Sequence, residues 1–405
     1  MAAPKLRFKE FDGDWERIKL SQMGTFKNGI NKDKEDFGHG VPFINLMDVF
    51  GKNSICQNTF DLVNASSKEI EAYSLKQGDV LFIRSSVKPE GVAETAVVLE
   101  DLDNTVYSGF LIRYRPSKDI DLHYKKYCFS TDFFRKNVLA LSTTSANTNI
   151  NQESLSLLNL DLPSKQEQTK IATFLSAVDE KISQLTQKHE LLSQYKQGMM
   201  QKLFSQEIRF KAVDGSEFGE WEETTLGLTG KFIGGGTPSK EVAEFWQGSI
   251  PWISSSDLVD ESIFNINITR FISTDALNQS ATKLIPANSI LIVSRVGVGK
   301  VAVTDRDICT SQDFTNLVLS NGNAVFFGYS IKSLTGRLLE MNQGTSIKGF
   351  VKDDLSNLKV QIPSLEEQTK IANFLSAIDQ KIEIVAQQIE QAKQWKKGLL
   401  QQMFV

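Results

Sequence analysis

The chain contains one stretch of sequence twice, first as Pro163-Ser164-Lys165-Gln166-Glu167-Gln168-Thr169-Lys170-Ile171-Ala172 and again as Pro363-Ser364-Leu365-Glu366-Glu367-Gln368-Thr369-Lys370-Ile371-Ala372. The two copies align without a gap at an offset of 200 residues, and the agreement continues between 174–179 and 374–379. A match of this length identifies an internal duplication. The sequence therefore predicts a fold made of two related halves.

The segments ahead of these copies also correspond, although more loosely. Trp15 corresponds to Trp221, and residues 80–85 correspond to residues 290–295. The apolar positions agree, whereas the polar positions between them differ. This pattern indicates two modules that share a scaffold and differ in their loops, as expected if the repeated segments keep one role while the modules recognise different targets.

Each repeated segment is predicted to be a long amphipathic helix. Ser164 and Ser364 follow a proline and precede Glu167 and Glu367 by three residues, which predicts a capping box at each helix start. Apolar residues then recur at intervals of three and four over roughly five heptads, the pattern of a coiled-coil seam. The seam residues are Ile171, Leu175, Val178, Ile182, Leu185, Leu192, Met199 and Leu203 in the first copy and Ile371, Leu375, Ile378, Ile382, Val385, Ile389, Leu399 and Met403 in the second.

The two helices are predicted to pair with each other. A helix over residues 166–204 is about 58 Å long at about 1.5 Å per residue, and its narrow apolar stripe requires a partner. Because the first helix leads from one module to the next and the second returns, we expect an antiparallel pair. His189 and Lys196 interrupt the first seam, and Ala392 and Lys396 weaken the second, which indicates either control of register or solvent-exposed helix ends.

The predicted fold class is α+β, with two globular mixed α/β domains separated by two long antiparallel coiled-coil helices in an internal pseudo-two-fold repeat. The predicted boundaries are 1–162 for the first module, 163–209 for the central helix, 210–362 for the second module and 363–405 for the C-terminal helix. Within the modules we expect strands at 41–46, 80–83, 96–99, 290–293 and 300–303, and helices at 124–136 and 324–340.

Composition sets limits on function. The net charge of -4 neither favours nor excludes a polyanionic partner, so any nucleic-acid interaction must depend on local placement of charge. The cysteines Cys56, Cys128 and Cys309 and the histidines lack the spacing of a disulfide framework or a metal site. No apolar run is long enough to span a membrane and no secretory leader is apparent, so we expect a cytoplasmic protein.

The repeated blocks also carry a family resemblance. The pattern Pro-Ser-x-x-Glu-Gln-x-Lys-Ile-Ala-x-Phe-Leu-Ser-Ala-(Val/Ile)-Asp-x-Lys-Ile, together with residues 234–239, 250–253 and 295–300, resembles the conserved regions of the specificity subunit of type I restriction–modification enzymes. The resemblance covers essentially the whole chain, and the duplicated helix motif is highly specific.

This resemblance implies a non-catalytic, phage-defence subunit with two target-recognition domains, each reading half of a bipartite asymmetric site in double-stranded DNA. It implies that the helices set the spacer and dock two adenine methyltransferase subunits, with restriction–translocase subunits added for cleavage. No cofactor is expected in this chain; S-adenosylmethionine, ATP and Mg are implied for the partner subunits.

Candidate DNA-binding residues were chosen by chemistry, because base edges and phosphates are bound mainly by Arg, Lys, Asn, Gln, Ser and Thr. Such residues gather at 84–88 and 141–149 in the first half, and at 237–240, 295–300 and 342–349 in the second. Arg84 and Arg295 stand out because they lie at equivalent strand ends. The candidates are Arg84, Ser85, Ser86, Lys88, Thr143, Thr144, Asn147, Asn149, Thr237, Ser239, Lys240, Arg295, Lys300, Thr345, Ser346 and Lys348.

The start of each long helix is a candidate interface for a methyltransferase subunit, since its polar face is duplicated and is expected to be exposed. The candidate residues are Gln166, Gln168, Lys170, Gln368 and Lys370.

Two glycine-containing segments imitate cofactor loops. Residues 232–236 superficially resemble a loop that binds S-adenosylmethionine, but the chain has no Pro-Pro pair, which a methyltransferase of base amino groups requires. Residues 297–301 have the wrong spacing for a phosphate loop and no Ser or Thr after Lys300. We interpret these glycines as turn formers, with positive φ in the second segment.

The sequence disfavours two alternatives to DNA recognition. A duplicated coiled-coil scaffold that binds only proteins is disfavoured by the polar loops and strand-end arginines, and an enzyme is disfavoured by the missing motifs. A helix pair about 50 Å long matches the length of about 14 base pairs at about 3.4 Å per step. This match favours a DNA site whose two recognised halves are separated by a spacer that the protein does not read.

Overall fold

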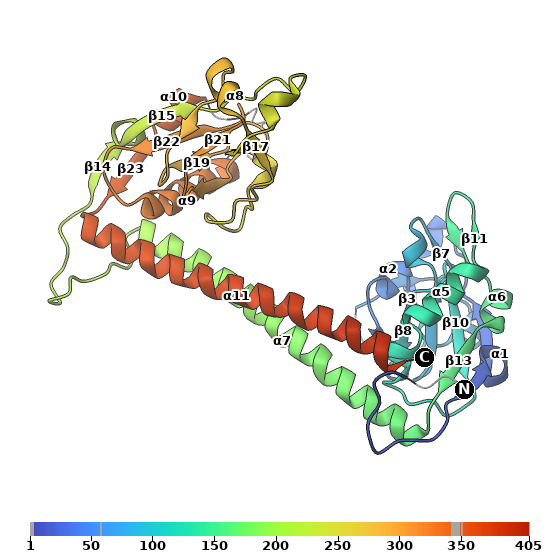
Figure 1. Cartoon of the computed structure of the whole chain (residues 1–405). Coiled ribbons are helices and arrows are strands. Elements are labelled where there is room, and N and C mark those ends of the chain that lie inside the picture. The colour runs from blue at the N-terminus through green and yellow to red at the C-terminus, as the bar shows by residue number, and fades with distance from the viewer. Residues whose placement is uncertain (1–3, 57–58, 342–348, 350, 405) are drawn as a thin grey trace. The chain divides into compact units, whose positions relative to one another are not determined.

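A computed structural model describes residues 4–56, 59–341, 349 and 351–404 of the chain (Figure 1). It divides into two compact units, one formed by Met1–Thr186 with Gln387–Val405 and the other by Gln187–Ala386. Each unit contains one globular module and part of two long helices, α7 (Lys165–Phe204) and α11 (Leu365–Met403). The predicted duplication is thus visible as two units whose boundary falls within the long helices.

The first module is built on a five-stranded sheet in the order β2-β10-β6-β8-β4. Its central strand β6 (Val80–Ile83) is buried at every position, as expected for an apolar run between two covered sheet faces. A smaller sheet, β5-β3-β9, contains the parallel pair β3 (Phe37–Ile44) and β9 (Val106–Tyr107).

The remaining elements of the first module are β1 (Glu16–Lys19), α1 (Leu20–Met23), β2 (Gly24–Asn28), η1 (Lys34–Asp36), α2 (Leu46–Val49), β4 (Ser54–Ile55), β5 (Asp61–Val63), α3 (Ser67–Tyr73), β7 (Ser85–Ser86), η2 (Pro89–Gly91), β8 (Thr95–Val98), β10 (Leu111–Pro116), α4 (Lys125–Cys128), α5 (Asp132–Leu141), β11 (Thr143–Thr144), β12 (Thr148–Asn149), α6 (Gln152–Leu157) and β13 (Asn159–Leu162).

The second module repeats this topology. Its main sheet has the order β15-β22-β19-β20, and its smaller sheet has the order β17-β16-β21-β18. β16 (Ile250–Ile253) pairs in parallel with β21 (Ile308–Thr310), as β3 pairs with β9. The remaining elements are β14 (Glu222–Thr225), η3 (Leu226–Leu228), β15 (Gly230–Gly234), η4 (Ala243–Trp246), η5 (Ser255–Asp257), β17 (Arg270–Ile272), α8 (Thr274–Gln279), β18 (Leu284–Ile285), β19 (Ile290–Ile292), β20 (Val301–Val303), β22 (Thr315–Leu319), α9 (Ala324–Met341), α10 (Lys352–Ser356) and β23 (Lys359–Ile362).

Most predicted elements are present, with different ends. The strand predicted at 80–83 is confirmed by β6, and α9 confirms the helix predicted at 324–340. The strands predicted at 96–99, 290–293 and 300–303 are found as β8, β19 and β20, each displaced or shortened by one residue.

Two predicted bounds were wrong because a capping residue was overlooked. The strand predicted at 41–46 ends at Ile44, since the Asn45 side chain accepts a hydrogen bond from the Leu46 amide and starts α2. The helix predicted at 124–136 is two helices, since the Thr131 hydroxyl accepts a hydrogen bond from the Phe134 amide and starts α5 anew.

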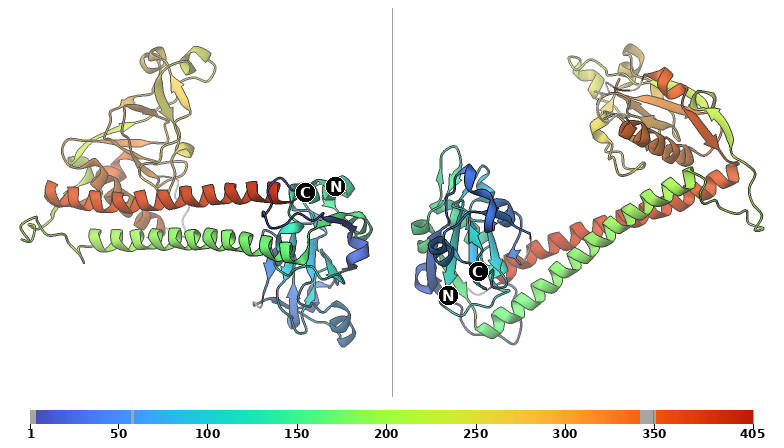
Figure 2. Two further views of the ribbon diagram at one scale, coloured as in Figure 1. Left: turned by 60° about the horizontal axis from the view of Figure 1, so that its bottom comes forward. Right: turned by 180° about the vertical axis from the view of Figure 1, so that it is seen from behind.

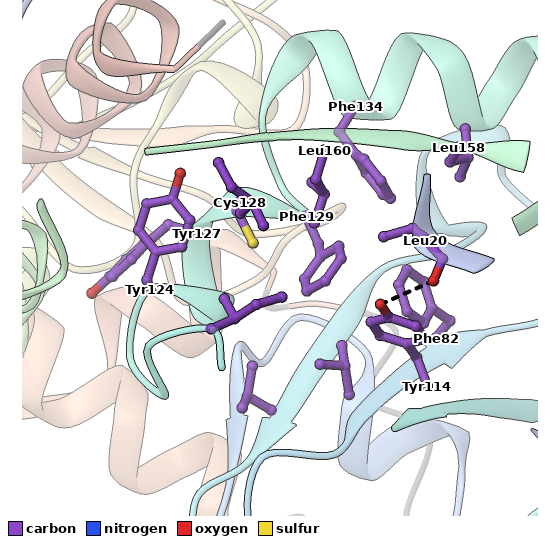
Figure 3. Close-up of a cluster of buried hydrophobic side chains, with 14 of the residues drawn as sticks. Leu20, Phe82, Tyr114, Tyr124, Tyr127, Cys128, Phe129, Phe134, Leu158 and Leu160 are labelled. Atoms are coloured by element: carbon purple, nitrogen blue, oxygen red, sulfur yellow. Dashed lines mark hydrogen bonds between the residues drawn. The ribbon is translucent and has the colours of Figure 1, made fainter. Parts of the chain in front are cut away.

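The core of the first module is rich in aromatic rings (Figure 3). Phe82 of β6, Phe129 at the end of α4 and Phe134 of α5 are fully buried. The ring centroids of Phe82 and Phe129 lie 5.4 Å apart in an edge-to-face arrangement. The buried Tyr114 hydroxyl of β10 donates a hydrogen bond of 3.2 Å to the Leu20 carbonyl, which satisfies the polar end of the ring. These contacts fix α1 and α5 on the central sheet.

The long helices pack side by side in antiparallel directions within each unit (Figure 2). In the first unit, Lys396 of α11 forms an ion pair of 2.5 Å with Asp179 of α7. In the second unit, Lys196 of α7 forms an ion pair of 2.6 Å with Asp379 of α11. The members of the two pairs differ by 200 in residue number, so the helices pair in the same register in both units. The predicted antiparallel helix pair is confirmed, and these ion pairs support the predicted role of the two lysines in register.

All sixteen predicted seam residues are buried or half-buried. The seam has a second role as well, because Ile171, Leu175 and Val178 belong to the aromatic core of the first module together with Leu399 and Met403 of α11. The corresponding residues of the second copy are part of the second module's core. The first turns of each helix therefore anchor a module and pair with the other helix at the same time.

Candidate nucleic-acid interface

The first module brings its two predicted polar loops together. β7 and β12 pair directly, with Ser86 opposite Thr148 and Ser85 opposite Asn149, and β11 continues this three-stranded sheet. Arg84 precedes β7 and is exposed, and its carbonyl accepts a hydrogen bond of 2.9 Å from the Ile150 amide. Exposed donors therefore gather at one edge of this module, which we call the first loop edge. Its candidate residues are Arg84, Ser85, Ser86, Lys88, Thr143, Thr144, Asn147 and Asn149.

The second module has a comparable loop edge. Arg295 is exposed in the loop that follows β19. Gly349 lies close to this loop, since a Cβ atom placed on it would be 2.4 Å from the Ser294 carbonyl oxygen and 3.4 Å from the Arg295 Cα. The chain after the predicted polar loop at 342–349 thus returns to Arg295. The candidates Thr345, Ser346 and Lys348 lie outside the described residues.

The two strand-end arginines do not occupy the same register. The Arg84 amide donates to the Phe110 carbonyl, and the Ser294 amide donates to the Asp313 carbonyl, both at 2.8 Å. Arg84 is therefore equivalent to Ser294, which is buried and hydrogen-bonded through its hydroxyl to the Asp313 carbonyl. Arg295 lies one residue further along the chain. Because successive side chains along a strand point to opposite faces, this offset means that Arg84 and Arg295 do not occupy equivalent positions. The predicted equivalence of the two strand ends is confirmed, as is the alignment of residues 80–85 with residues 290–295.

The glycine-rich loop of the second module is shaped by close packing. A Cβ on Gly235 would lie 2.0 Å from the Ser311 carbonyl oxygen, and one on Gly236 would lie 2.4 Å from the Ala281 carbonyl carbon. Residues 235–239 form no turn, so the interpretation of these glycines as turn formers was wrong. They instead permit close backbone approach. Positive φ is confirmed at Gly297 and Gly299, at 81° and 92°.

The polar candidates that follow these glycines have different surroundings. The Thr237 hydroxyl donates to the Gln312 side chain, and the Ser239 carbonyl accepts a hydrogen bond of 3.0 Å from Trp246 Nε1. Lys240 is exposed. Thr237 is therefore hydrogen-bonded to the segment that follows β21, whereas the exposed Lys240 can approach a ligand.

Lys300 is hydrogen-bonded within the second module. It is half-buried, and its ammonium donates to the Leu258 carbonyl at 2.8 Å and to the Ser255 carbonyl at 3.4 Å. These bonds hold the η5 loop against the loop that follows β19. Lys300 therefore positions two loops of the scaffold, and its contact with DNA stays a prediction.

One arginine of this surface was missed from the sequence. Arg270 of β17 pairs with Asp257, donates to the Ser254 hydroxyl at 2.8 Å and lies over the Trp252 ring at 4.7 Å. Trp252 and Arg270 are opposite each other on paired strands, and the register of that pair cannot be read from one sequence. The arginine orders the loop that holds Ser254 and leaves its own side chain 38% exposed.

Each module is joined to the long helices by the same three side chains. In the first unit, the Tyr127 hydroxyl donates to the Asp179 carboxylate at 2.9 Å, and Lys396 pairs with that carboxylate while its ammonium lies 5.7 Å from the Tyr127 ring. Tyr329 and the pair formed by Asp379 and Lys196 repeat this arrangement in the second unit. Burial raises the pKa of both tyrosines. We call these two sets the junction triads.

A second repeated contact lies at each helix start. The Glu167 carboxylate, buried to 1% exposure, accepts two hydrogen bonds from Arg7, and the Glu367 carboxylate accepts two from Arg209. Ser164 and Ser364 accept the Glu167 and Glu367 amide hydrogen bonds, so the serine half of each predicted capping box is confirmed, while the glutamates bind arginine instead. The carboxylate hydrogen bond raises the pKa of each arginine.

The predicted partner interface needs correction. Gln168 and Gln368 are buried, and each side chain donates to the preceding proline carbonyl at 2.9 Å and accepts an amide hydrogen bond from its module. Lys170 pairs with Glu10 at 3.4 Å, and Lys370 donates to the Lys211 carbonyl at 2.6 Å. The two glutamines hold the helix starts in their modules and are not available to a partner. Lys370 is half-buried, whereas the Lys170 side chain is 53% exposed despite its ion pair. Gln166 is exposed.

Two searches of the described residues gave negative results. No group of three or more His, Cys, Asp or Glu residues is arranged to hold a metal ion. Among the helices of the described segments, none combines the length and hydropathy needed to cross a membrane.

The fold defines a class of protein with two recognition modules on one scaffold. Each module has a polar loop edge and is joined to the pair of duplicated helices through a junction triad. The chain belongs to the family described as the type I restriction modification DNA specificity domain, which matches residues 12–194 and 219–394. It is a specificity subunit of a type I restriction–modification complex, and catalysis lies in the partner subunits. The scaffold and enzyme alternatives are therefore set aside.

Relatives match over most of the chain. The putative MjaX specificity subunit of Methanocaldococcus jannaschii is 27% identical over 98% of this chain and 94% of its own length. The HindI specificity subunit of Haemophilus influenzae is 26% identical over 87% of this chain and 90% of its own. The S subunit of a type I system from M. genitalium has a similar fold, with a TM-score of 0.58 at 18% identity, covering 100% of this chain and 99% of that one.

Proposed function

We propose that each module reads one half of a bipartite, asymmetric site in double-stranded DNA through its loop edge. The observation that carries this proposal is the gathering of arginine, hydroxyl and amide side chains at the first loop edge, with the exposed Arg295 beside the equivalent strand end of a similar scaffold. Arginine and lysine bind phosphates and guanine edges, and hydroxyl and amide groups bind either. The proposed contacts are Arg84, Ser85, Ser86, Lys88, Thr143, Thr144, Asn147, Asn149, Thr237, Ser239, Lys240, Arg295, Lys300, Thr345, Ser346 and Lys348.

The helices are proposed to set the spacer between the two half-sites. α7 contains 40 residues, which corresponds to about 60 Å at about 1.5 Å per residue. We retain the functional boundaries 1–162, 163–209, 210–362 and 363–405, because the helices have one role and the modules another. The duplicated helix starts are proposed to dock two adenine methyltransferase subunits, with Gln166 and Lys170 as the exposed candidates of the original set.

The partner subunits complete the proposed activity. Specificity subunits need no cofactor of their own, and we assign S-adenosylmethionine, ATP and Mg to the methyltransferase and restriction–translocase subunits. The target adenine would be flipped into the methyltransferase, since chemistry on a base requires its removal from the stack. The proposed location is the cytoplasm, where the DNA is.

The loop-edge proposal is tested in the complex reconstituted with the methyltransferase subunit. The DNA site is first mapped by long-read sequencing of methylated adenines, and binding to it is measured at fixed salt, because phosphate contacts make affinity salt-dependent. Arg84→Ala and Arg295→Ala should each weaken binding by about 5- to 100-fold, in line with about 1–3 kcal/mol per arginine contact.

The matched control is Arg306→Ala, since the Arg306 side chain is 59% exposed and pairs only with its neighbour Asp305 among the partners found. Its affinity should stay at the wild-type value. Unchanged affinity in both loop-edge variants, with assembly intact, would rule out DNA recognition at these edges.

The spacer proposal is tested by lengthening both helices together. Seven residues inserted after Thr186 in α7 and after Ala386 in α11 keep the heptad pattern and both junction triads. The insertion adds about 10 Å, so the mapped spacer should lengthen by about 3 base pairs while both half-sites stay the same. A changed half-site with an unchanged spacer would contradict the proposal. An insertion of three residues, which breaks the seam, serves as the control and should abolish assembly.

A further inference from the structure

The first loop edge carries exposed apolar side chains as well as polar ones. Met47 is 68% exposed, Phe50 44%, Val87 81% and Phe110 58%. Single exposed apolar residues are common on protein surfaces, but a group at one functional edge calls for an explanation.

Backbone contacts place these side chains beside the proposed DNA-binding residues. Phe110 lies opposite Arg84 across the paired ends of β6 and β10, where opposite side chains share a face at about 5 Å. Phe50 lies beside Ser86, because a Cβ on Gly91 would be 3.1 Å from the Phe50 ring and 2.4 Å from the Ser86 hydroxyl.

Met47 reaches the same edge through the smaller sheet. β3 and β9 run in parallel, so their carboxyl ends meet, and the Ser108 amide donates to the Ile44 carbonyl at 2.9 Å. Met47 follows β3 and Phe110 follows β9 by three residues each. Both side chains therefore leave the sheet at one end.

The second module has polar residues at the matching positions. The Asn45 amide donates to Asp48 at 2.9 Å, and the Ser254 amide donates to Asp257 at 2.7 Å in the same type of turn. This register makes Ser256 the counterpart of Met47, and the strand-end bonds described above make Asp313 the counterpart of Phe110. The scaffolds agree, and the chemistry of the two edges differs.

We infer that Met47 and Phe110 contact thymine methyl groups in the half-site read by the first module. Ser256 and Asp313 make no such contacts at the corresponding positions of the second module, whose loop edge carries the exposed apolar side chain of Val296 beside Arg295 instead. The inference rests on the proposed function. The thymine methyl is the one apolar group that bases present in the major groove, and apolar side chains are its natural partners.

A protein partner fits the same edge less well. Lysine and serine are depleted in protein–protein interfaces relative to the rest of the surface, although arginine is enriched there. Here Arg84 and Lys88 are exposed between the apolar side chains, with Ser85 and Ser86 half-exposed beside them. Interleaved arginine, hydroxyl and apolar groups match the mixed chemistry of base edges.

The test removes single methyl groups from the DNA. Duplexes carrying the mapped site are made with deoxyuridine in place of thymidine in one half at a time, and binding to the methyltransferase-bound complex is measured. Removing a contacted methyl should weaken binding about 4-fold, since one buried methyl-sized group contributes about 0.8 kcal/mol. The half-site read by the first module should respond.

Protein variants then assign the responding half-site. Met47→Ser and Phe110→Ser should abolish the response to deoxyuridine there, because the apolar partner is gone. Phe133→Ser is the control, since Phe133 is 42% exposed on α5, whose Asp132 contacts α11 rather than the loop edge. This variant should keep the wild-type response.

Three outcomes would overturn the inference. The first is equal affinity for thymidine-containing and deoxyuridine-containing DNA in both half-sites, and the second is an unchanged response to deoxyuridine in both serine variants. The third is a Phe110-dependent rise in the fluorescence of a 2-aminopurine placed in the site, which would indicate that Phe110 inserts between bases and unstacks them. If Arg84→Ala still weakens binding in that case, only the methyl-contact inference fails. If it does not, the loop-edge proposal fails too.

Discussion

The junctions and the loop edges of this protein differ in how closely they repeat. At the junctions, Tyr127 and Tyr329 meet an aspartate and a lysine in the same arrangement in both units. At the loop edges, Met47 and Phe110 correspond to Ser256 and Asp313. A contact that must join module to helix pair tolerates little change, whereas a surface that reads a different sequence in each half requires it. The junctions are therefore the structural framework of the chain, and the loop edges are its proposed DNA-reading surfaces.

The largest effect is expected where the helix seam enters the module core. Leu175 and Leu375 are fully buried at repeat-related positions. Leu175→Ala and Leu375→Ala should each lower the free energy of unfolding by about 2–5 kcal/mol, through lost apolar contact and the cavity left behind. Urea unfolding measures the change, and Leu191→Ala, at a position 56% exposed on α7, should stay within about 0.5 kcal/mol of wild type. Strongly unequal losses for the two leucines would break the symmetry of the junctions.

The arginine–glutamate contacts should reveal a smaller asymmetry. Arg7→Ala leaves the buried Glu167 carboxylate unpaired, which costs about 3 kcal/mol. Arg209→Ala should cost about 1 kcal/mol less, because Glu367 keeps a hydrogen bond of 3.2 Å from Trp221 Nε1. Among the described residues, none accepts a hydrogen bond from the buried Trp15 Nε1, the counterpart of the Trp221 donor. Thermal or urea unfolding of both variants decides the order, and the reverse order would show that Trp221 does not support Glu367.

A still smaller difference in stability is expected between variants of the two junction triads. Lys196 and Asp379 are 12% and 9% exposed, whereas Lys396 and Asp179 are both 24% exposed. Lys196→Met should therefore destabilise by about 1–2 kcal/mol and Lys396→Met by about 1 kcal/mol or less, since solvent screens the more exposed pair. Lys393→Met, which removes a pair within one exposed helix turn, is the control and should have almost no effect. Equal losses in both lysine variants would argue against burial as the cause.

The smallest effect is expected in the pH dependence of folding stability. Hydrogen bonds from Lys32 and from Ser66 hold the pKa of Glu69 at about 2. A carboxylate with a lowered pKa in the folded state contributes stability above its unfolded pKa of about 4.3 and loses it as the pH falls towards 2. Glu69→Gln should therefore lower stability by no more than about 1 kcal/mol at pH 6, with the difference shrinking below about pH 4.5.

Urea unfolding of wild type and Glu69→Gln between pH 6 and pH 3 measures this dependence. Ala276 stands at the corresponding position of α8, so the second module has no equivalent group. A difference that grows as the pH falls would contradict the assigned cause.

Much of the architecture could be predicted because it depends on local pattern. A heptad repeat identifies a helix with one buried stripe, and the 200-residue offset identifies the duplication, without knowledge of any long-range contact. Central strands such as β6 could be predicted for the same reason. The capping residues Asn45 and Thr131 were also visible in the sequence, and reading them would have corrected two element ends.

The site was only partly predictable. The sequence selected the polar loops of the first module, and the structure joins them through β7 and β12. It could not show that Lys300 binds two carbonyls, that Gln168 is buried, or that Arg270 lies across from Trp252. Each of these depends on which strand or loop lies opposite, and a single sequence does not contain that register.

The sequence by itself therefore determined the duplication, the two long helices with their antiparallel seam, and the families of side chains available for binding DNA. The tertiary structure alone decided which of those side chains reach solvent at a common edge and which are used to hold the module together. The physical reason is that helix periodicity is set by neighbours three and four residues away, whereas the fate of a polar side chain is set by carbonyls, carboxylates and rings that long-range packing brings to it.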